Sequence, residues 1–146
     1  MAGREKAAEL FAGGYNCAQS VLGAFCSEVG LDDRTALKIT AGFGGGLSCG
    51  EICGAVSGAV MFIGLKCGFY DANDLSRKSY CSGKTSEFIK KFKEANGSLI
   101  CRDLLSSKAP GPGGNGAPPA QKSRKAICTG LVECAAGLLE SMEFED

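Results

Sequence analysis

Cysteine dominates the chemistry available to this sequence. The 146-residue chain contains nine cysteines and no histidine. The lack of histidine excludes an imidazole general base, a Cys-His nucleophile pair, a mixed Cys/His zinc site and a histidine-ligated haem. A metal site would therefore depend on thiolates, with carboxylates as the other available ligands.

The nine cysteines divide by their position relative to the ends of predicted helices. Near a helix N-terminus, free backbone N–H groups and the positive end of the helix dipole stabilise a thiolate, the form that binds metals or attacks. Five cysteines fall in the first turns of predicted helices: Cys17, Cys49, Cys53, Cys101 and Cys128. The other four lie near helix C-termini, inside helices or beside a break, and are expected to be small buried side chains: Cys26, Cys67, Cys81 and Cys134.

Spacing excludes compact cysteine motifs. The chain has no Cys-x-x-Cys, so zinc-ribbon and thioredoxin signatures are absent and a site must be assembled from distant helices. Cys53 and Cys67 would lie about 21 Å apart along one helix, too far for one metal or one disulfide. Cys49 is four residues before Cys53 and can face the same way, so its role stays open.

A glycine-rich loop followed by an apolar helix is the element that must position these residues. Ser48 and Glu51 have the spacing of a capping box, which predicts a helix from Cys49 to about Lys66. Glycines inside a helix lower its propensity and are typical of close packing against another backbone. Three lie in this segment: Gly54, Gly58 and Gly64. The sequence therefore predicts a buried central helix with its chemistry at the N-terminal end.

The other helices are predicted from apolar spacing, polar caps and glycine stops. They fall at residues 4–13, 17–29, 34–40, 71–95 with a break near 82–83, 99–105 and 124–142. No stretch alternates with the period of a half-buried strand. The fold class is all-α, a compact bundle of six or seven helices in a single domain, 1–146. All four prolines lie in residues 106–121, which are expected to form an exposed flap.

Charge and hydropathy exclude several classes of partner. Sixteen acidic and sixteen basic residues balance without long blocks, which argues against binding nucleic acid or an anionic membrane. The apolar run 52–65 is too short and too rich in glycine to span a bilayer. The N-terminus lacks the apolar core of a signal peptide, so we expect a cytoplasmic protein. In a reducing cytosol, an odd number of cysteines favours metal binding or redox chemistry over structural disulfides.

Motifs along most of the chain resemble the redox-active C_GCAxxG_C_C family. They are Tyr15-Asn16-Cys17-Ala18-Gln19-Ser20-Val21-Leu22, Gly42-Phe43-Gly44-Gly45-Gly46, Cys53-Gly54-Ala55-Val56-Ser57-Gly58-Ala59, Cys101-Arg102-Asp103-Leu104-Leu105, and Cys128 with Leu131-Val132. The family's four hallmark cysteines correspond to Cys17, Cys53, Cys101 and Cys128. The chain departs from the family label in having Ile52 before Cys53, and its five additional cysteines and Pro/Gly-rich segment are outside the pattern.

The family is similar to the cluster-bearing part of split-Soret cytochromes c, which are dimeric and hold an iron–sulfur centre beside their haems. This chain lacks the haem-attachment Cys-x-x-Cys-His. The resemblance implies an all-α domain, an iron–sulfur cluster and assembly into a homodimer.

The leading hypothesis is an iron–sulfur protein with a [2Fe–2S] cluster on Cys17, Cys53, Cys101 and Cys128, which exchanges electrons with a redox partner protein or senses redox state. It would carry no catalytic residues of its own. The alternatives are a thiol–disulfide oxidoreductase that uses the same cysteines without a cofactor, and a structural zinc site with the four cysteines as ligands.

Overall fold

The computed structural model describes residues 3–108 and 124–145. Within these ranges the chain forms seven α-helices and no β-strand, which confirms the all-α class. The helices are α1 (Gly3–Ala12), α2 (Cys17–Phe25), α3 (Asp33–Thr40), α4 (Gly54–Cys67), α5 (Leu75–Asn96), α6 (Cys101–Lys108) and α7 (Arg124–Ser141). Short 3-10 helices follow α2 and α3, namely η1 (Cys26–Val29) and η2 (Ala41–Phe43). A turn with non-helical backbone angles, η3 (Gly46–Gly50), precedes α4.

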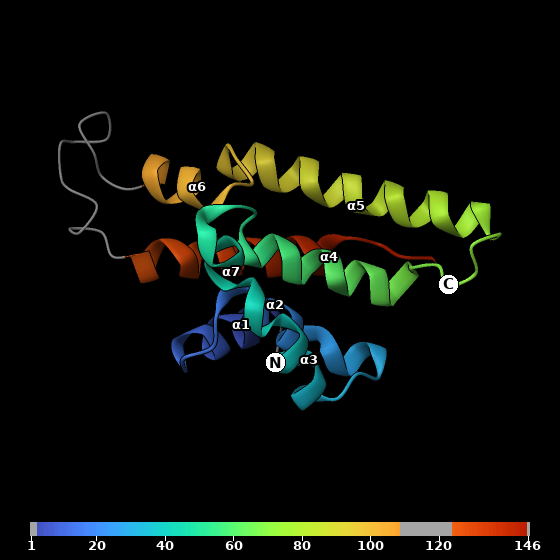
Figure 1. Cartoon of the computed structure of the whole chain (residues 1–146), viewed down its shortest axis with the longest axis horizontal. Coiled ribbons are helices and arrows are strands. Elements are labelled where there is room, and N and C mark those ends of the chain that lie inside the picture. Colours follow the sequence, from blue (N-terminus) through green and yellow to red (C-terminus); the bar gives the residue numbers. More distant parts are fainter. Residues whose placement is uncertain (1–2, 109–123, 146) are drawn as a thin grey trace.

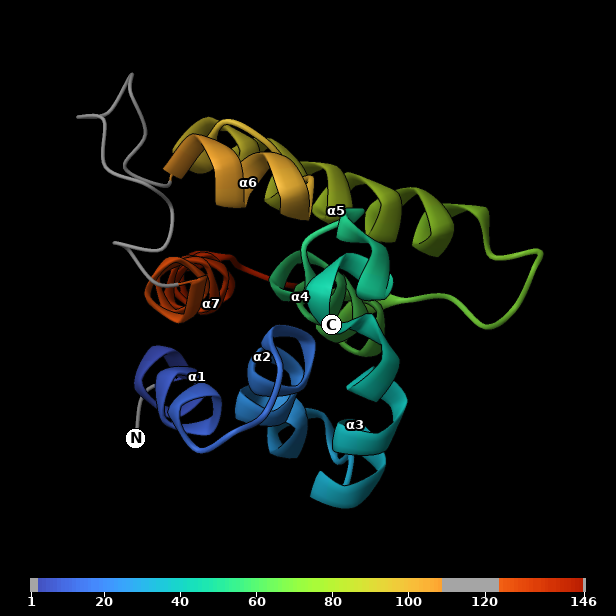
Figure 2. The same cartoon turned by 60° about the vertical axis from the view of Figure 1, so that its left-hand side comes forward.

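The helices pack around α4, which lies at the centre of the bundle (Figures 1 and 2). α2 packs along one side of α4, and α5 packs along another. α1 lies against both α2 and α7, and α7 also contacts α2, α4 and α5. The largest fully buried side chains come from several of these helices and include Leu22, Ile63, Phe88, Phe92 and Leu104. The predicted buried central helix is therefore present.

Two of the three glycines of α4 have the predicted packing role. A Cβ on Gly58 would lie 2.6 Å from the carbonyl oxygen of Ala18, so only glycine allows α2 to approach this closely. A Cβ on Gly54 would also meet backbone and side-chain atoms of α2 within 3.2 Å. Gly64 is exposed and has no such neighbour, so the close-packing interpretation is wrong for that residue.

The predicted start of the central helix is wrong by five residues. α4 begins at Gly54, with Cys53 as its N-cap, and the expected capping box of Ser48 and Glu51 does not form. The reason is the backbone before it, since Leu47 and Ser48 have φ values of 62° and 59°, in the left-handed region. Cys49 therefore lies in η3 and not on the helix.

The predicted break in the long helix after residue 71 is also wrong. α5 starts at Leu75, capped by the Asp74 side chain, and continues without interruption through Gly83. A single interior glycine costs only about 1 kcal/mol. Burial of Phe88 and Phe92, whose rings stack with centroids 5.9 Å apart, favours one continuous helix against the core.

Of the predicted flap at 106–121, the first three residues belong to α6 and the rest lie outside the described residues. Among the helices that the structure describes, none combines the length and apolar character needed to cross a membrane.

Candidate functional site

Four cysteines from four separate segments line one cavity of about 380 Å³. They are the four that the sequence selected: Cys17, Cys53, Cys101 and Cys128. Each is buried, with 3% to 8% of its surface exposed. They come from the starts of α2, α4 and α6 and from one turn into α7, and Figure 1 shows the starts of α4, α6 and α7 at the same end of the molecule. The remaining wall is largely apolar and includes Phe11, Leu105 and Leu131.

A capping box positions Cys17 as the first residue of α2. The side chain of Asn16 accepts a hydrogen bond from the backbone N–H of Gln19 at 2.8 Å, and the Gln19 side chain accepts one from the Asn16 N–H at 3.0 Å. The Asn16 amide also donates to the carbonyl of Ala41, which ties the start of α2 to η2. The N-cap predicted from the sequence is confirmed, and it fixes the direction in which α2 leaves the cavity.

A short backbone pairing brings Cys53 and Cys101 to the same side of the cavity. Ile52 and Ile100 form an isolated antiparallel bridge. The N–H of Cys53 donates to the carbonyl of Leu99 at 2.8 Å, and the N–H of Cys101 donates to the carbonyl of Glu51 at 2.6 Å. The two cysteines thus leave the bridge as the starts of α4 and α6. Their proximity needs this long-range pairing, which no local sequence signal specifies.

An exposed ion pair covers the same pairing from the solvent side. The guanidinium of Arg102 lies 2.9 Å from the carboxylate of Glu51 and also donates to the carbonyl of Gly50 at 3.2 Å. The Arg102 and Glu51 side chains are 59% and 49% exposed, so the pair adds little stability by itself. Its contribution is to hold the segment before Cys53 against the first turn of α6.

Glycines at two positions allow the segments that carry the cysteines to pack closely against each other. A Cβ on Gly46 would lie 2.8 Å from the Cβ of Cys101 and closer still to the backbone of Glu51. A Cβ on Gly54 would lie 3.2 Å from the Cβ of Cys17. Larger side chains at Gly46 or Gly54 would push away the segments that carry Cys101 and Cys17.

The loop before α4 contains an unusual left-handed turn. Gly45, Gly46, Leu47 and Ser48 have consecutive positive φ values of 59° to 65°. This conformation costs a non-glycine residue about 1–2 kcal/mol, so Leu47 and Ser48 are held there by the surrounding structure. The turn is closed by a 3.0 Å hydrogen bond from the N–H of Glu51 to the carbonyl of Gly46. Residues 51–53 follow this turn and pair with residues 99–101.

Cys17 and Cys128 form the most closely coupled pair of thiols. Their side chains lie within hydrogen-bonding reach, with the Cys17 thiol as donor and the Cys128 thiolate as acceptor. This hydrogen bond, with help from the nearby Arg124 guanidinium, lowers the pKa of Cys128 to about 7. The same hydrogen bond, followed by burial and the neighbouring thiols, raises the pKa of Cys17 well above its usual range. As the pH rises, Cys128 therefore loses its proton well before Cys17 does.

At the other two thiols, Cys53 and Cys101, burial raises the pKa and works against the stabilisation of a thiolate at a helix N-terminus. Burial raises the pKa of Cys53 to about 11, although the backbone N–H groups of Ala55 and Val56 hydrogen-bond to its sulfur and act in the opposite direction. Burial also raises the pKa of Cys101, against the opposite effect of Arg124. The expectation that helix starts lower the pKa of these cysteines is therefore wrong for Cys17, Cys53 and Cys101. The pKa of Cys128 is lowered, but by the hydrogen bond from Cys17 and by Arg124, not by the helix start.

Cys49 does not line this cavity. It is exposed on η3, where its thiol donates to the carbonyl of Gly46 at 3.4 Å. It lines an adjacent cavity of about 430 Å³, which also includes Cys101, Arg102 and Arg124. The two cavities share four lining residues, Gly45, Cys101, Leu105 and Arg124. Cys49 is therefore next to the four-cysteine cavity but does not line it.

The remaining cysteines lie away from the cavity. The buried thiol of Cys26 donates to a carboxylate oxygen of Asp33 at 3.3 Å, and Cys134 accepts a hydrogen bond from Asn96 at 3.4 Å. Cys67 and Cys81 face each other between α4 and α5, a pairing that sequence reasoning missed.

The four thiols surround a space but do not converge on a point. Among the residues described, no three Cys, Asp or Glu side chains are arranged closely enough to hold a single metal ion.

The protein is therefore of a recognisable class, a small helical bundle with a cysteine-lined site. Its four cysteines lie at or near the starts of helices and line one cavity. The chain matches, over residues 15–142, the model of the family described as "Putative redox-active protein (C_GCAxxG_C_C)". It belongs to this redox-active family, as the resemblance of its motifs indicates. Neither the search of curated proteins nor the search of solved structures gave a match.

Proposed function

We propose that the protein is an iron–sulfur redox protein whose cluster, of the [2Fe–2S] type, is held by Cys17, Cys53, Cys101 and Cys128. The observation that supports this proposal is that all four thiols line one cavity although they come from four segments of the chain. Four thiolates are the usual ligand set for such a cluster. When bound, the cluster supplies electron transfer, and the protein would pass electrons to a partner protein or sense redox state.

The residues around the thiols fit a negatively charged group. Arg124 and Lys125 line the cavity, and the Arg124 guanidinium lies close enough to Cys101 and Cys128 to favour their thiolates. The N–H groups of Ala55 and Val56 point at the sulfur of Cys53. Hydrogen bonds to ligand sulfurs raise the reduction potential of a cluster. The N–H groups of Ala55 and Val56 would therefore raise the reduction potential of a cluster bound to Cys53.

The spacing of the thiols favours a cluster over a structural zinc site. A zinc site with four cysteine ligands needs all four sulfurs about 2.3 Å from one ion. In the described part of the chain no three candidate ligands are placed for one ion, whereas the thiols do surround a cavity. A cluster contains several atoms and therefore suits ligands that are spread around a space.

Thiol–disulfide exchange is a second candidate function, favoured by the contact between Cys17 and Cys128. The Cys128 thiolate would attack a substrate disulfide and release one thiol. Cys17 would then attack the mixed disulfide and release the second thiol, leaving a Cys17–Cys128 disulfide in the protein. Two electrons pass from the two cysteines to the substrate in this sequence.

Anaerobic purification followed by an absorption spectrum and metal analysis tests the proposal. The cluster predicts bands between about 320 and 460 nm, with matched amounts of iron and acid-labile sulfide. A colourless protein without metal whose thiols cycle reversibly would instead support disulfide exchange. A colourless protein with one zinc per chain would support the structural site.

A pair of variants tests the choice of ligands. Cys53→Ser should abolish the absorption bands and the bound iron, because it removes one of the four thiols that line the cavity. Cys134→Ser is the matched control, since Cys134 lies away from the cavity on α7. Equal loss of iron in both variants would overturn the assignment.

A further inference from the structure

Two cysteines outside the cavity are brought together by the packing of α4 on α5. Cys67 is the last residue of α4, and Cys81 lies in the second turn of α5. Residues 68–74 join the two helices, so the chain reverses direction between the cysteines (Figure 1). Cys67 is fully buried, whereas Cys81 is half-buried at the edge of the core. Neither residue lines the four-cysteine cavity.

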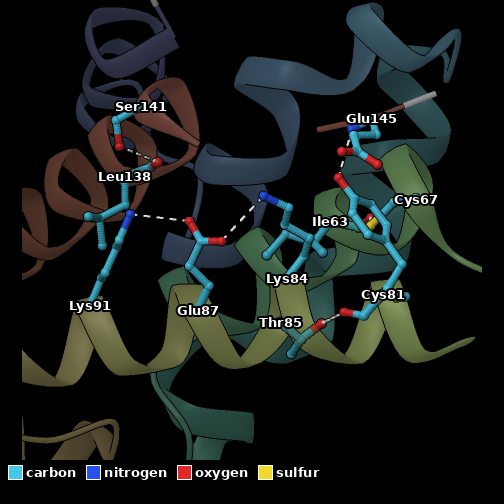
Figure 3. A network of polar contacts seen from close by, with 11 residues as sticks. Ile63, Cys67, Cys81, Lys84, Thr85, Glu87, Lys91, Leu138, Ser141 and Glu145 are labelled. Carbon is cyan, nitrogen blue, oxygen red and sulfur yellow. Dashed lines mark hydrogen bonds and ion pairs between the residues drawn. The ribbon is translucent and has the colours of Figure 1, made fainter. Parts of the chain in front are cut away.

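The thiols are placed within reach of each other. The side chain of Cys81 lies within hydrogen-bonding reach of Cys67, whose thiol is also 3.2 Å from the carbonyl oxygen of Ile63. Figure 3 shows Cys67 and Cys81 in one region of the helix interface, with Lys84 of α5 nearby. Both cysteines are free thiols in this structure.

Basic side chains on α5 surround the pair. Burial is the main cause that raises the pKa of Cys67, and Cys81 adds to it, while Arg77 and Lys84 act in the opposite direction. Arg77 and Lys84 lie one turn before and one turn after Cys81 on the same helix. Their positive charges therefore offset part of the effect of burial on the Cys67 thiol.

We propose that Cys67 and Cys81 form a reversible intramolecular disulfide, a second redox site that is separate from the four-cysteine cavity. The oxidant is a small-molecule disulfide such as oxidised glutathione. The half-buried Cys81 reacts first as its thiolate, forming a mixed disulfide and releasing one glutathione thiol. Cys67 then attacks the Cys81 sulfur, completes the protein disulfide and releases the second glutathione thiol. The two cysteines lose two electrons and two protons in total, and the glutathione disulfide gains them.

The difference in exposure sets the order of these steps. Glutathione cannot reach the fully buried Cys67, so Cys67 acts only on a disulfide already formed at Cys81. The product closes a loop of about 15 residues between the end of α4 and α5. Such a link removes conformations from the unfolded chain, so we expect the oxidised protein to melt roughly 5–10 °C higher than the reduced one.

Peptide mapping after oxidation tests the proposal directly. The reduced full-length protein is incubated with oxidised glutathione, its remaining thiols are alkylated, and it is digested with trypsin without reduction. Cleavage after Lys66, Arg77, Lys78 and Lys84 places the two cysteines on different peptides, 67–77 and 79–84. The expected product is these two peptides joined by a disulfide that disappears on reduction. Recovery of Cys81 as a stable glutathione adduct, or of both cysteines as free thiols, would overturn the proposal.

Two variants keep the result interpretable. Cys67→Ala should leave Cys81 as a mixed disulfide with glutathione, because the second thiol is missing. Cys81→Ser changes a half-buried residue and should leave Cys67 unmodified, with no rise in melting temperature on oxidation. A crosslinked peptide or a full thermal shift in Cys81→Ser would assign the effect to other cysteines. Because neither residue lines the four-cysteine cavity, this outcome is independent of whether that cavity binds a cluster.

Discussion

One cation, at the start of α7, affects the ionisation of two of the four cavity thiols. Arg124 lies four residues before Cys128, lines the cavity with it, and hydrogen-bonds to its sulfur. The hydrogen bond from Cys17 is the largest cause that lowers the pKa of Cys128 to about 7, and Arg124 adds to it. Arg124 also favours the thiolate of Cys101. The Arg124 side chain therefore favours the thiolate form of two of the four cavity cysteines.

We predict that Arg124→Gln raises the pKa of Cys128, because it removes the positive charge but keeps a polar side chain. In the reduced, metal-free protein, alkylation of Cys128 by iodoacetamide at pH 7 should become several-fold slower, and its pH midpoint should move upward. Peptide mapping of Cys128 across a pH series measures this midpoint. Lys125→Gln is the matched control, since Lys125 lines the same cavity but is not among the groups that lower the pKa of Cys128. Identical midpoints in the two variants would contradict the role given to Arg124.

At the scale of the elements, helix starts could be predicted where the cap is local. Asn16 and Gln19 are three residues apart and form the capping box that the sequence indicates. The start of α4 was predicted wrongly because the pattern of Ser48 and Glu51 is also compatible with a left-handed turn. That turn is stabilised by residues far along the chain, through the pairing of 51–53 with 99–101.

The selection of the four cavity cysteines was possible from the sequence for a related reason. Cys17, Cys53 and Cys101 lie at helix starts, and their position relative to caps and glycines is a local property. The Cys67–Cys81 pair depends instead on how α4 and α5 pack after the loop between them. No local pattern encodes that register, so these two cysteines looked like ordinary buried residues.

The glycines of α4 provide a test of element packing on a single helix. Gly58→Ala would place a Cβ 2.6 Å from the carbonyl of Ala18, which would force α2 and α4 apart. We expect a loss of about 1–3 kcal/mol in the free energy of unfolding, measured by urea denaturation. Gly64→Ala meets no atom within 4 Å and should instead gain about 0.5–1 kcal/mol from helix propensity. Opposite signs are the expected result, and equal effects would contradict the packing argument.

At the scale of the whole molecule, the cavity is the place where separate parts of the fold meet. Its cysteines lie in α2, α6 and α7 and at the N-cap of α4, and α6 is the shortest of these four helices. An eight-residue helix is not stable alone in water, so α6 depends on its contacts, mainly with η3 and α7, and on the burial of Leu104. A group bound by all four thiols would tie α6 covalently to the three longer helices.

We therefore predict that loading the cavity with an iron–sulfur cluster slows amide hydrogen exchange most strongly in α6. Such a four-thiol link would suppress local opening of α6, the shortest of the helices that carry the cavity cysteines. Hydrogen–deuterium exchange with mass spectrometry, on the metal-free and the reconstituted protein, measures the change. α3 is the internal control, because it has the same eight-residue length and no residue that lines the cavity. Protection that is equal in α3 and α6 would indicate general stabilisation, and no protection in α6 would argue that Cys101 is not a ligand.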